Sequence, residues 1–387
     1  MRTLVALVVG LLTLGGAMSV EAKELPKVEA LPQVRELPDP FLFMDGKRVK
    51  SRGSWAARRA ELKELVQHYA YGTLPPTTGR VKAVEDSSSR LESGATERKL
   101  TLAVDPGRKL LVHLVLTVPQ GPGPFPTIVD GDLCWGRVAP NIVTEATSRG
   151  YALAEFDRTD LAIDENKRTG GLYSLYPEGD FGAISAWAWG FHRVVDYLRT
   201  LRFVDSRRIA ITGHSRGGKA ALLAGALDDR VALVAPNNSG CMGAGCCRFP
   251  NQGETVERIT SVFPYWFSPT LKQFVKQEDR LPFDQHSLKA LVAPRPLLST
   301  EGLEDNWANQ PGTQLTYQAA REVYRFLGVP EKIGIVFRPG GHAHSLPDWQ
   351  SLLDFADWQL LGKQPTRRFD QLHYPDASAG GYTWRAP

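Results

Sequence analysis

Residues 213–217 read Gly-His-Ser-Arg-Gly, a G-x-S-x-G pattern that can carry a serine nucleophile on a sharp turn. An apolar stretch, residues 208–212, precedes the pattern, and a helical stretch rich in Ala and Leu follows it. A nucleophile on such a turn needs a strained backbone, and the flanking glycines let the strand and helix approach each other. The helix would direct its first N–H groups at an anion forming beside the serine. We therefore expect Ser215 to be a nucleophile; the alternative is an ordinary Gly-rich turn.

A serine hydroxyl becomes reactive when a base takes its proton, and in this motif the partners follow in the order serine, acid, histidine. The chain reads Gly-Gly-His-Ala-His directly after its last predicted strand. His342 is the preferred base because it follows the glycine pair that would turn the chain over the end of the sheet, and His344 is the alternative. His68, His192 and His113 fall in predicted helices or a strand, where a structural role is more common.

The acid that orients the histidine should follow the preceding strand, where residues 302–307 read Gly-Leu-Glu-Asp-Asn-Trp. Asp305 is the first candidate and Glu304 the second. A solvated surface acid is the ordinary explanation for a single aspartate, although a position between a strand and a helix favours a role in a site. The predicted catalytic residues are therefore Ser215, His342 and Asp305, with Glu304 as the alternative acid.

The elements that would position these residues alternate between short apolar strands and longer helical segments. This alternation predicts an α/β fold with a mostly parallel central sheet and helices on both faces, a three-layer sandwich. The predicted strands are residues 127–130, 152–157, 208–212, 233–236, 296–300 and 334–338. The predicted helices are residues 182–200, 218–227, 314–326 and 346–361.

The ends of the chain have a different character from this central part. Residues 1–22 combine a short basic start, an apolar run and a Val-x-Ala site, which predicts a signal peptide and export to the periplasm or the medium. We expect residues 23–90 to form an arm and a helix packed on the core, residues 91–363 the catalytic domain, and residues 364–387 a tail over the surface. The helix is expected at 55–71 and two further strands at 98–104 and 110–118.

Composition excludes several classes of function. The formal net charge is +4 without a block of Lys or Arg, so nucleic-acid binding has no support. No stretch after the signal peptide is apolar enough for a membrane helix. The four cysteines lack the spacing of a zinc site, and their disulfide pairing stays open. We expect no metal and no organic cofactor. The cysteines are Cys134, Cys241, Cys246 and Cys247.

A series of specific short motifs extends this pattern along the chain. They are D-F-G-A at 180–183, A-W-A-W-G at 186–190, G-H-S-R-G-G-K at 213–219, A-G-A-L-D at 224–228, N-S-G at 238–240, G-E-T at 253–255, L-P-F-D-Q-H at 281–286, A-P-R-P at 293–296, E-D-N-W-A at 304–308 and R-P-G-G-H at 338–342. In these motifs the chain resembles the glucuronoyl esterases of carbohydrate esterase family 15. The resemblance implies an α/β-hydrolase fold.

The resemblance also implies roles for residues near the serine. Arg216 is similar to the arginine of the family that reaches the oxyanion site, where a cation would stabilise negative charge. Lys219 resembles the lysine that holds sugar hydroxyls, and Glu254 and Trp307 match positions that bind the uronate ring. The alternative for Arg216 and Lys219 is a solvated first helical turn, although cations are unfavourable at that helix end.

The chain departs from the pattern of the family at two points. Many members carry a glutamate as the triad acid where this chain has Asn238, so the acid must come from Asp305 or Glu304. Fungal members join a cysteine before the nucleophile to one after the histidine, but this chain has His214 and Ala343 there. This places it with the bacterial branch.

The resemblance implies hydrolysis of 4-O-methyl-glucuronoyl esters that link glucuronoxylan to lignin alcohols, by an exported enzyme expected to be a monomer. The oxyanion would be held by Arg216 and backbone N–H groups, including those of Asp132 or Leu133. Two alternatives remain at this point. One is an acetylxylan esterase or a peptidase on the same fold, and the other is a carbohydrate-binding protein that has lost catalysis.

Overall fold

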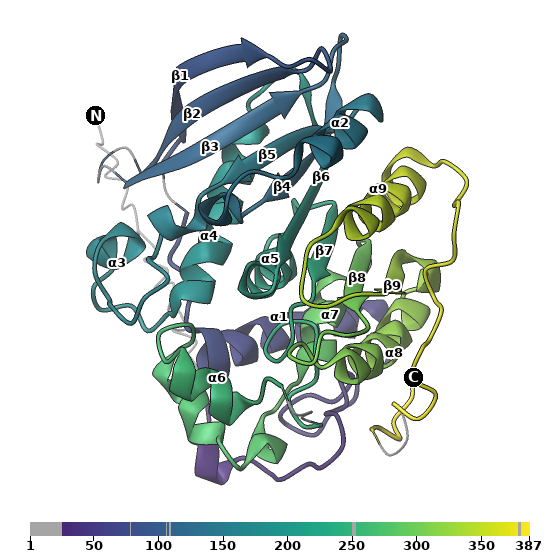
Figure 1. Cartoon of the computed structure of the whole chain (residues 1–387). Helices are drawn as coiled ribbons and strands as arrows, with labels where there is room; N and C mark the ends of the chain where they lie inside the picture. The colour runs from purple at the N-terminus through teal and green to yellow at the C-terminus, as the bar shows by residue number, and fades with distance from the viewer. Residues whose placement is uncertain (1–24, 78, 106, 108–109, 250–252, 378–380) are drawn as a thin grey trace, which may run out of the picture.

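The computed structural model describes residues 25–387 except 78, 106, 108–109, 250–252 and 378–380. The predicted signal peptide lies outside these residues. A nine-stranded sheet has the order β1-β2-β3-β5-β4-β6-β7-β8-β9 (Figure 1). Its strands are β1 (Lys82–Arg90), β2 (Thr96–Asp105), β3 (Leu110–Val118), β4 (Phe125–Asp130), β5 (Ala152–Phe156), β6 (Val204–His214), β7 (Leu233–Asn237), β8 (Leu297–Gly302) and β9 (Ile333–Arg338).

The central part of the sheet is parallel, as the sequence predicts. The pairs β5–β4, β4–β6, β6–β7, β7–β8 and β8–β9 are parallel, whereas β1–β2, β2–β3 and β3–β5 are antiparallel. The carboxyl ends of the parallel strands therefore meet at one edge of the sheet, where ligands bind in open α/β sheets.

Helices cover both faces of the sheet. Successive side chains of a strand point to opposite faces, so a strand made of apolar residues needs a helix layer on each side. Ile128 packs with helices α2 (Pro140–Ser148) and α9 (Leu346–Leu361), while its neighbour Val129 belongs to the larger core on the other face. The remaining helices are α1 (Arg52–Val66), α3 (Gly171–Leu175), α4 (Ala183–Leu198), α5 (Arg216–Leu227), α6 (Val256–Val262), α7 (Gln285–Val292) and α8 (Gln310–Phe326). The predicted three-layer α/β-hydrolase architecture is confirmed.

Several elements differ from the predictions. The helix expected at 55–71 ends at Val66 and continues as one π-helical turn, Gln67–Tyr71. Strand β1 had no counterpart among the predictions, because its fully exposed side chains give no apolar alternation. It pairs with β2 and so joins residues 82–90 to the main sheet.

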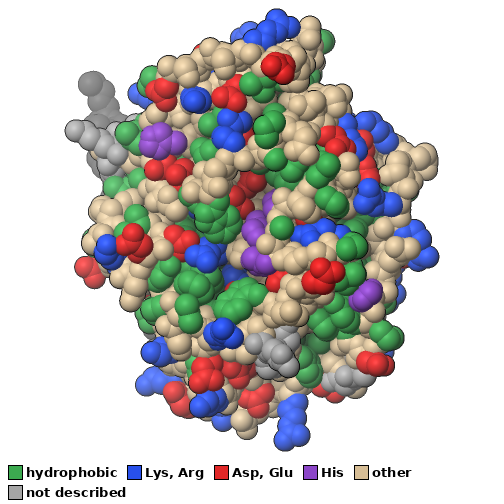
Figure 2. Space-filling view, viewed as in Figure 1, with side chains coloured by type: hydrophobic (Ala, Val, Ile, Leu, Met, Phe, Trp, Pro, Cys, Tyr) green, Lys and Arg blue, Asp and Glu red, His purple; other side chains and the backbone are tan. Residues whose placement is uncertain are grey.

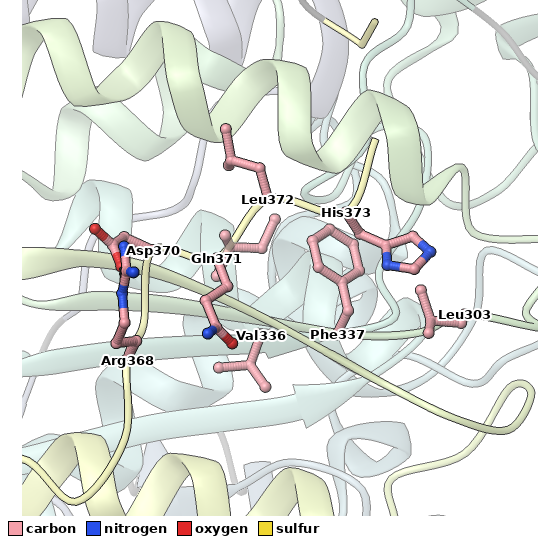
Figure 3. A pocket seen from close by; sticks show the side chains of 9 residues that line it. Leu303, Val336, Phe337, Arg368, Asp370, Gln371, Leu372 and His373 are labelled. Atoms are coloured by element: carbon pink, nitrogen blue, oxygen red, sulfur yellow. Dashed lines mark hydrogen bonds and ion pairs between the residues drawn. The ribbon is translucent and has the colours of Figure 1, made fainter. Parts of the chain in front are cut away.

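The two ends of the described chain lie against each other. Leu37 N donates to Gly381 O at 2.8 Å, and Trp384 Nε1 donates to Leu37 O at 2.7 Å. The C-terminal segment also crosses β9, where Ile335 N donates to Phe369 O at 2.7 Å. A pocket of about 460 Å³ lies between this segment and β9, and Ser215 is not among the residues that line it (Figure 3). No helix among the described residues is long and apolar enough to cross a membrane.

Candidate active site

Ser215 sits on the sharp turn between β6 and α5, with φ 54° and ψ −121°. This positive φ is unusual for a residue with a side chain and marks local strain. Ser215 N donates to Asn237 O at 2.9 Å, which ties the turn to the end of β7. A Cβ atom on Gly213 would lie 2.6 Å from the Gly217 backbone, so the first glycine is required by close packing. The sequence motif therefore has the strand–turn–helix geometry that positions a serine nucleophile, with Ser215 8% exposed.

Asp132, in the loop after β4, holds the same turn from the other side. Its Oδ2 accepts the His214 N–H at 2.6 Å, and its Oδ1 pairs with Arg158. A Cβ atom on Gly217 would collide with this carboxylate, which explains the second glycine of the motif. Sequence reasoning considered only the backbone of Asp132, and its position two residues past a predicted strand was the available signal.

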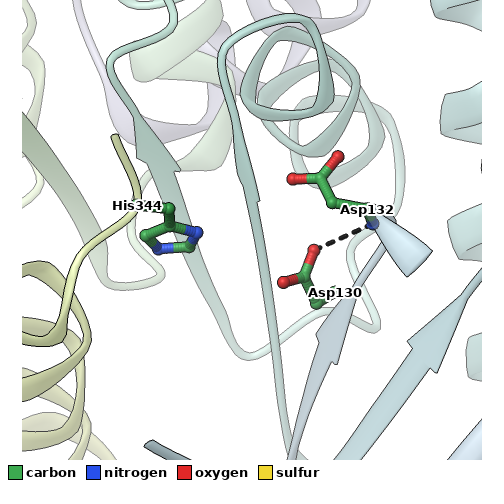
Figure 4. A group of neighbouring side chains, drawn as sticks. All are labelled: Asp130, Asp132 and His344. Carbon is green, nitrogen blue, oxygen red and sulfur yellow. Dashed lines mark hydrogen bonds between the residues drawn. The ribbon is translucent and has the colours of Figure 1, made fainter. Parts of the chain in front are cut away.

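Asp130, Asp132 and His344 form a compact group at the carboxyl end of β4 (Figure 4). Their ligand atoms lie within 4.8 Å of one another, the one such group in the part of the chain that the structure describes. Asp130 Oδ1 accepts the Asp132 N–H at 3.0 Å. Burial and the neighbouring carboxylate of Asp132 raise the pKa of Asp130 well above its usual range. Since both Asp132 oxygens are already engaged, the group works as a support for the turn.

His342 and Asp305 are joined as the sequence predicts for a base and its acid. His342 Nδ1 donates to Asp305 Oδ2 at 2.5 Å, and Asp305 is buried. The other oxygen, Oδ1, accepts the backbone N–H groups of Trp307 at 3.0 Å and Ala308 at 3.2 Å. The carboxylate is therefore fixed, and its bond to Nδ1–H leaves Nε2 of His342 free to accept a proton. The alternative acid, Glu304, is exposed and makes no side-chain hydrogen bond within the described chain.

The loop that carries His342 is tied down by two buried polar side chains. Arg338 NH2 donates to Gly341 O at 3.2 Å and to Ala343 O at 2.5 Å, while its Nε binds Asp348 at 2.6 Å. Asn238 donates through Nδ2 to Ala343 O at 3.0 Å and accepts the Gly302 N–H at 2.7 Å. An amide can do both, whereas an ionised acid could only accept. Asn238, expected only as a missing acid, links the ends of β7 and β8 to the histidine loop.

His214 lies directly against His342, with ring centroids 4.4 Å apart. Its Nδ1 donates to Asn237 Oδ1 at 2.6 Å. Burial, aided by the nearby His342, lowers the pKa of His214 to about 4, so the ring is neutral near pH 7. No hydrogen bond joins Ser215 to His342, although both residues are described; such contacts often tighten only when substrate binds.

His344, the alternative base, is placed differently from His342. Its ring stacks on Trp349 with centroids 4.9 Å apart, and it belongs to the group with Asp130 and Asp132. Burial lowers the pKa of His344 well below its usual value, and His214 and Arg338 add to this effect. Of the two histidines, His342 alone makes a hydrogen bond to a carboxylate in the described chain.

Arg216 is held beside the serine by aromatic rings and one carboxylate. Its guanidinium carbon lies 4.6 Å from the Trp266 ring centroid and 4.9 Å from that of Phe263, and NH1 binds Asp164 at 2.7 Å. Its buried Nε has no hydrogen-bond partner among the described residues. A buried donor without a partner is costly, so Nε is available to an incoming anion. Nothing in the sequence pointed to Asp164, which lies outside the predicted elements.

The backbone donors expected at the oxyanion site differ in their contacts. The Asp132 N–H is already bound to Asp130. The Leu133 and Arg216 N–H groups have no acceptor within the described chain. A negatively charged oxygen could therefore be met by Arg216, through Nε and its backbone N–H, and by Leu133.

Lys219 and Glu254 form a buried ion pair next to the serine helix. Lys219 Nζ donates to Glu254 Oε2 at 2.7 Å, to Ser239 O at 2.6 Å and to Cys241 O at 2.7 Å. All three ammonium hydrogens are thus in use, and direct binding of a sugar hydroxyl by Lys219 would require one contact to be exchanged. Glu254 Oε1 is likewise buried, but it has no hydrogen-bond partner among the described residues.

Trp307 is half-buried at the edge of this region. Glu254 N donates to Trp307 O at 3.0 Å, so the two predicted substrate-binding residues are brought together. The Arg258 guanidinium lies 4.6 Å from the Trp307 ring centroid and covers one face of the indole. The face of the molecule shown in Figure 2 has a group of histidine side chains near its centre, with hydrophobic side chains around them.

Comparisons with known proteins agree with this arrangement. The family model described as "Glucuronyl esterase, fungi" matches residues 103–328. A carbohydrate esterase from an unknown prokaryotic organism is 33% identical, with 84% of this chain and 90% of the relative covered. A 4-O-methyl-glucuronoyl methylesterase of Podospora anserina is 35% identical over 82% of this chain and 66% of its own length.

A solved structure gives the same result. The carbohydrate esterase family 15 glucuronoyl esterase from Caldicellulosiruptor kristjansonii superposes with a TM-score of 0.79 at 34% identity, covering 93% of this chain and 99% of that one. The resemblance seen in the sequence motifs is thereby confirmed. With this match over most of its length, the chain belongs to the glucuronoyl esterases of carbohydrate esterase family 15.

Proposed function

We propose that this protein hydrolyses carboxylic esters of 4-O-methyl-glucuronic acid, of the kind that join glucuronoxylan to lignin alcohols. Membership of the glucuronoyl esterase family supports the substrate class, and the name of the Podospora anserina relative supports the uronate part. The observation that carries the reaction type is the strained Ser215 turn together with the Asp305–His342 pair.

The proposed reaction is a two-step acyl transfer. His342 Nε2 takes the proton of Ser215 Oγ as this oxygen attacks the ester carbonyl, and Asp305 stabilises the imidazolium. The carbonyl oxygen becomes negative and is met by Arg216 and backbone N–H groups. When the tetrahedral intermediate collapses, His342 returns the proton to the departing alcohol. Water then attacks the acyl-enzyme with His342 as base, and the uronic acid leaves.

The uronate ring is assigned to the side of the serine formed by the loops after β7 and β8. The free Glu254 Oε1 accepts a ring hydroxyl hydrogen, Lys219 holds this carboxylate in place, and Trp307 offers one apolar face. This chemistry needs no metal and no organic cofactor. We also propose that the enzyme works outside the cytoplasm, because residues 1–22 have the pattern of a signal peptide.

Hydrolysis of benzyl glucuronate by the purified enzyme, measured beside an aryl acetate, tests this proposal. Turnover of the glucuronate, reduced to trace levels in Ser215→Ala, is the expected result. Release of acetate alone would favour the deacetylase alternative, and binding of glucuronoxylan without cleavage of either ester would favour a binding protein. Retained turnover in Ser215→Ala would refute the mechanism.

A further inference from the structure

An exposed tryptophan lies beside the serine on the side away from Glu254. Trp135 ends a short helical turn, Leu133–Trp135, in the loop after β4, and it is 50% exposed. Its ring centroid lies 6.1 Å from that of His214 and 5.7 Å from the Arg216 guanidinium carbon. An exposed indole at this place has no use in the mechanism described so far.

The Trp135 ring is held in a fixed orientation by a buried cation. The Arg158 guanidinium carbon lies 4.1 Å from the ring centroid, and Arg158 is fully buried. Arg158 also pairs with Asp132 and contacts the Trp187 ring at 4.9 Å, so it is itself immobilised. A buried cation this close must cover the inner face of the indole. Arg216 also lies over the ring, at the longer distance of 5.7 Å, and the 50% exposure of Trp135 is therefore assigned to the face away from Arg158.

The order of the strands places this surface opposite the proposed uronate site. Strand β6, which ends at the serine, lies between β4 and β7. Trp135 follows β4, whereas Glu254 and Trp307 belong to the loops after β7 and β8. The two flanks of the nucleophile thus carry different side chains, and an ester has two parts on either side of its carbonyl.

The position of the base indicates which part faces Trp135. The departing alcohol oxygen must reach His342 to receive its proton. His342 and Trp135 both lie against the ring of His214, at centroid distances of 4.4 Å and 6.1 Å. An alcohol that leaves beside His342 therefore has its substituent near the outer face of Trp135.

Resting on the function proposed above, we infer that Trp135 is a specificity-determining residue that stacks against the aromatic ring of an aryl alcohol in the ester. A methyl ester has no group to reach this surface, whereas a benzyl ester does. The deacylation step is the same for both esters because the alcohol has already left. The effect of Trp135 must therefore appear in kcat/KM, which reports the acylation step.

The test compares kcat/KM for benzyl and methyl glucuronate in the wild-type enzyme, Trp135→Ala and Trp135→Phe. Loss of one aromatic stacking contact is expected to lower the benzyl-to-methyl ratio about three- to tenfold in Trp135→Ala. Trp135→Phe, which keeps a ring over Arg158, should give an intermediate ratio. Leu372→Ala removes a similarly exposed apolar side chain, 49% exposed, in the C-terminal segment beside β9, and should leave the ratio unchanged.

Each alternative result has a defined meaning. An unchanged ratio, with both esters slowed equally, would show that Trp135 only supports Arg158 and would overturn the inference. Slower turnover only of esters carrying a longer xylan chain would assign the surface to sugar and would also overturn it. If the wild-type enzyme cleaves no glucuronate ester, the proposed function fails. The inference is then judged by the same ratio for benzyl and methyl acetate, which share the two alcohols.

Discussion

Replacing Asp305 by Asn removes the negative charge that faces His342 and keeps an oxygen for the backbone contacts. Asp305 Oδ2 lies 2.5 Å from His342 Nδ1, and Oδ1 accepts the N–H groups of Trp307 and Ala308. Loss of one partner of a buried charge pair costs about 3–5 kcal/mol. The imidazolium that faces Asp305 forms during the attack of the serine, so this cost falls on the transition state and not on the folded protein. His342 is 34% exposed, so solvent screening places the effect toward the lower end of that range. At about 1.4 kcal/mol per factor of ten, kcat should fall about 100- to 1000-fold.

The assay is initial-rate hydrolysis of benzyl glucuronate by the wild-type enzyme, Asp305→Asn and Glu304→Gln. Glu304 is the adjacent residue, exposed and without a side-chain hydrogen bond in the described chain, and is the matched control. We expect Glu304→Gln to retain full kcat, and Asp305→Asn to unfold at nearly the wild-type temperature. If Asp305→Asn kept more than a tenth of kcat, or if Glu304→Gln were the impaired variant, our assignment of the acid would be wrong.

Three further predictions follow from buried groups of the structure. Glu254→Gln leaves the Lys219 ammonium buried without a counter-charge and should lower the free energy of unfolding in urea by about 3–5 kcal/mol. The double variant that also carries Lys219→Met should be less destabilised. Equal losses of unfolding free energy in the single and double variants would contradict this reasoning. The folded-state pKa of His214 is lowered to about 4, so the unfolded chain binds this proton first and stability should fall as the pH drops from about 6.5 to about 4. The thermal midpoints at pH 7 and pH 4.5 should differ less in His214→Asn than in the wild-type enzyme. The same difference in both proteins would argue against the lowered pKa. Cys241 Sγ and Cys247 Sγ lie 3.5 Å apart, whereas Cys246 faces Asp284, so protein made under oxidising conditions should carry a Cys241–Cys247 disulfide. Mass spectrometry of tryptic peptide 231–248 should then find one alkylated cysteine before reduction and three after it. Three alkylated cysteines in both samples would rule the disulfide out.

The sheet that carries the site could be predicted from sequence because its strands are buried on both faces. Strands such as β4 and β7 are short apolar runs, and their predicted bounds differ from the observed ones by at most two residues. Helix α9 was predicted with its observed bounds, since a serine and a proline begin it and Gly362 ends it. In contrast, β1 is exposed along its whole length, and helix α2 follows a loop without a strong apolar period.

The candidate site was only partly visible in the sequence. Ser215, His342 and Asp305 could be proposed because each follows a strand that ends at the same edge of the sheet. The choice between Asp305 and Glu304 could not be made, because adjacent side chains after a strand differ in direction and only packing decides which one turns inward. The contacts of Asp164 and Trp135 depend on loops that come together only in the folded molecule, so these contacts cannot be predicted from spacing along the chain.

The contacts around Ser215 hold its strained backbone in place. A positive φ at a residue with a side chain costs about 1–3 kcal/mol and persists only where neighbouring groups impose it. Here Asn237 holds the turn from β7, and the Asp132 carboxylate holds it from the loop after β4. Asp132 is in turn fixed by Arg158, the same cation that orients the indole of Trp135. The position of the nucleophile and the surface assigned to the alcohol therefore share one buried support, so a change at Arg158 should alter both turnover and the preference for the alcohol.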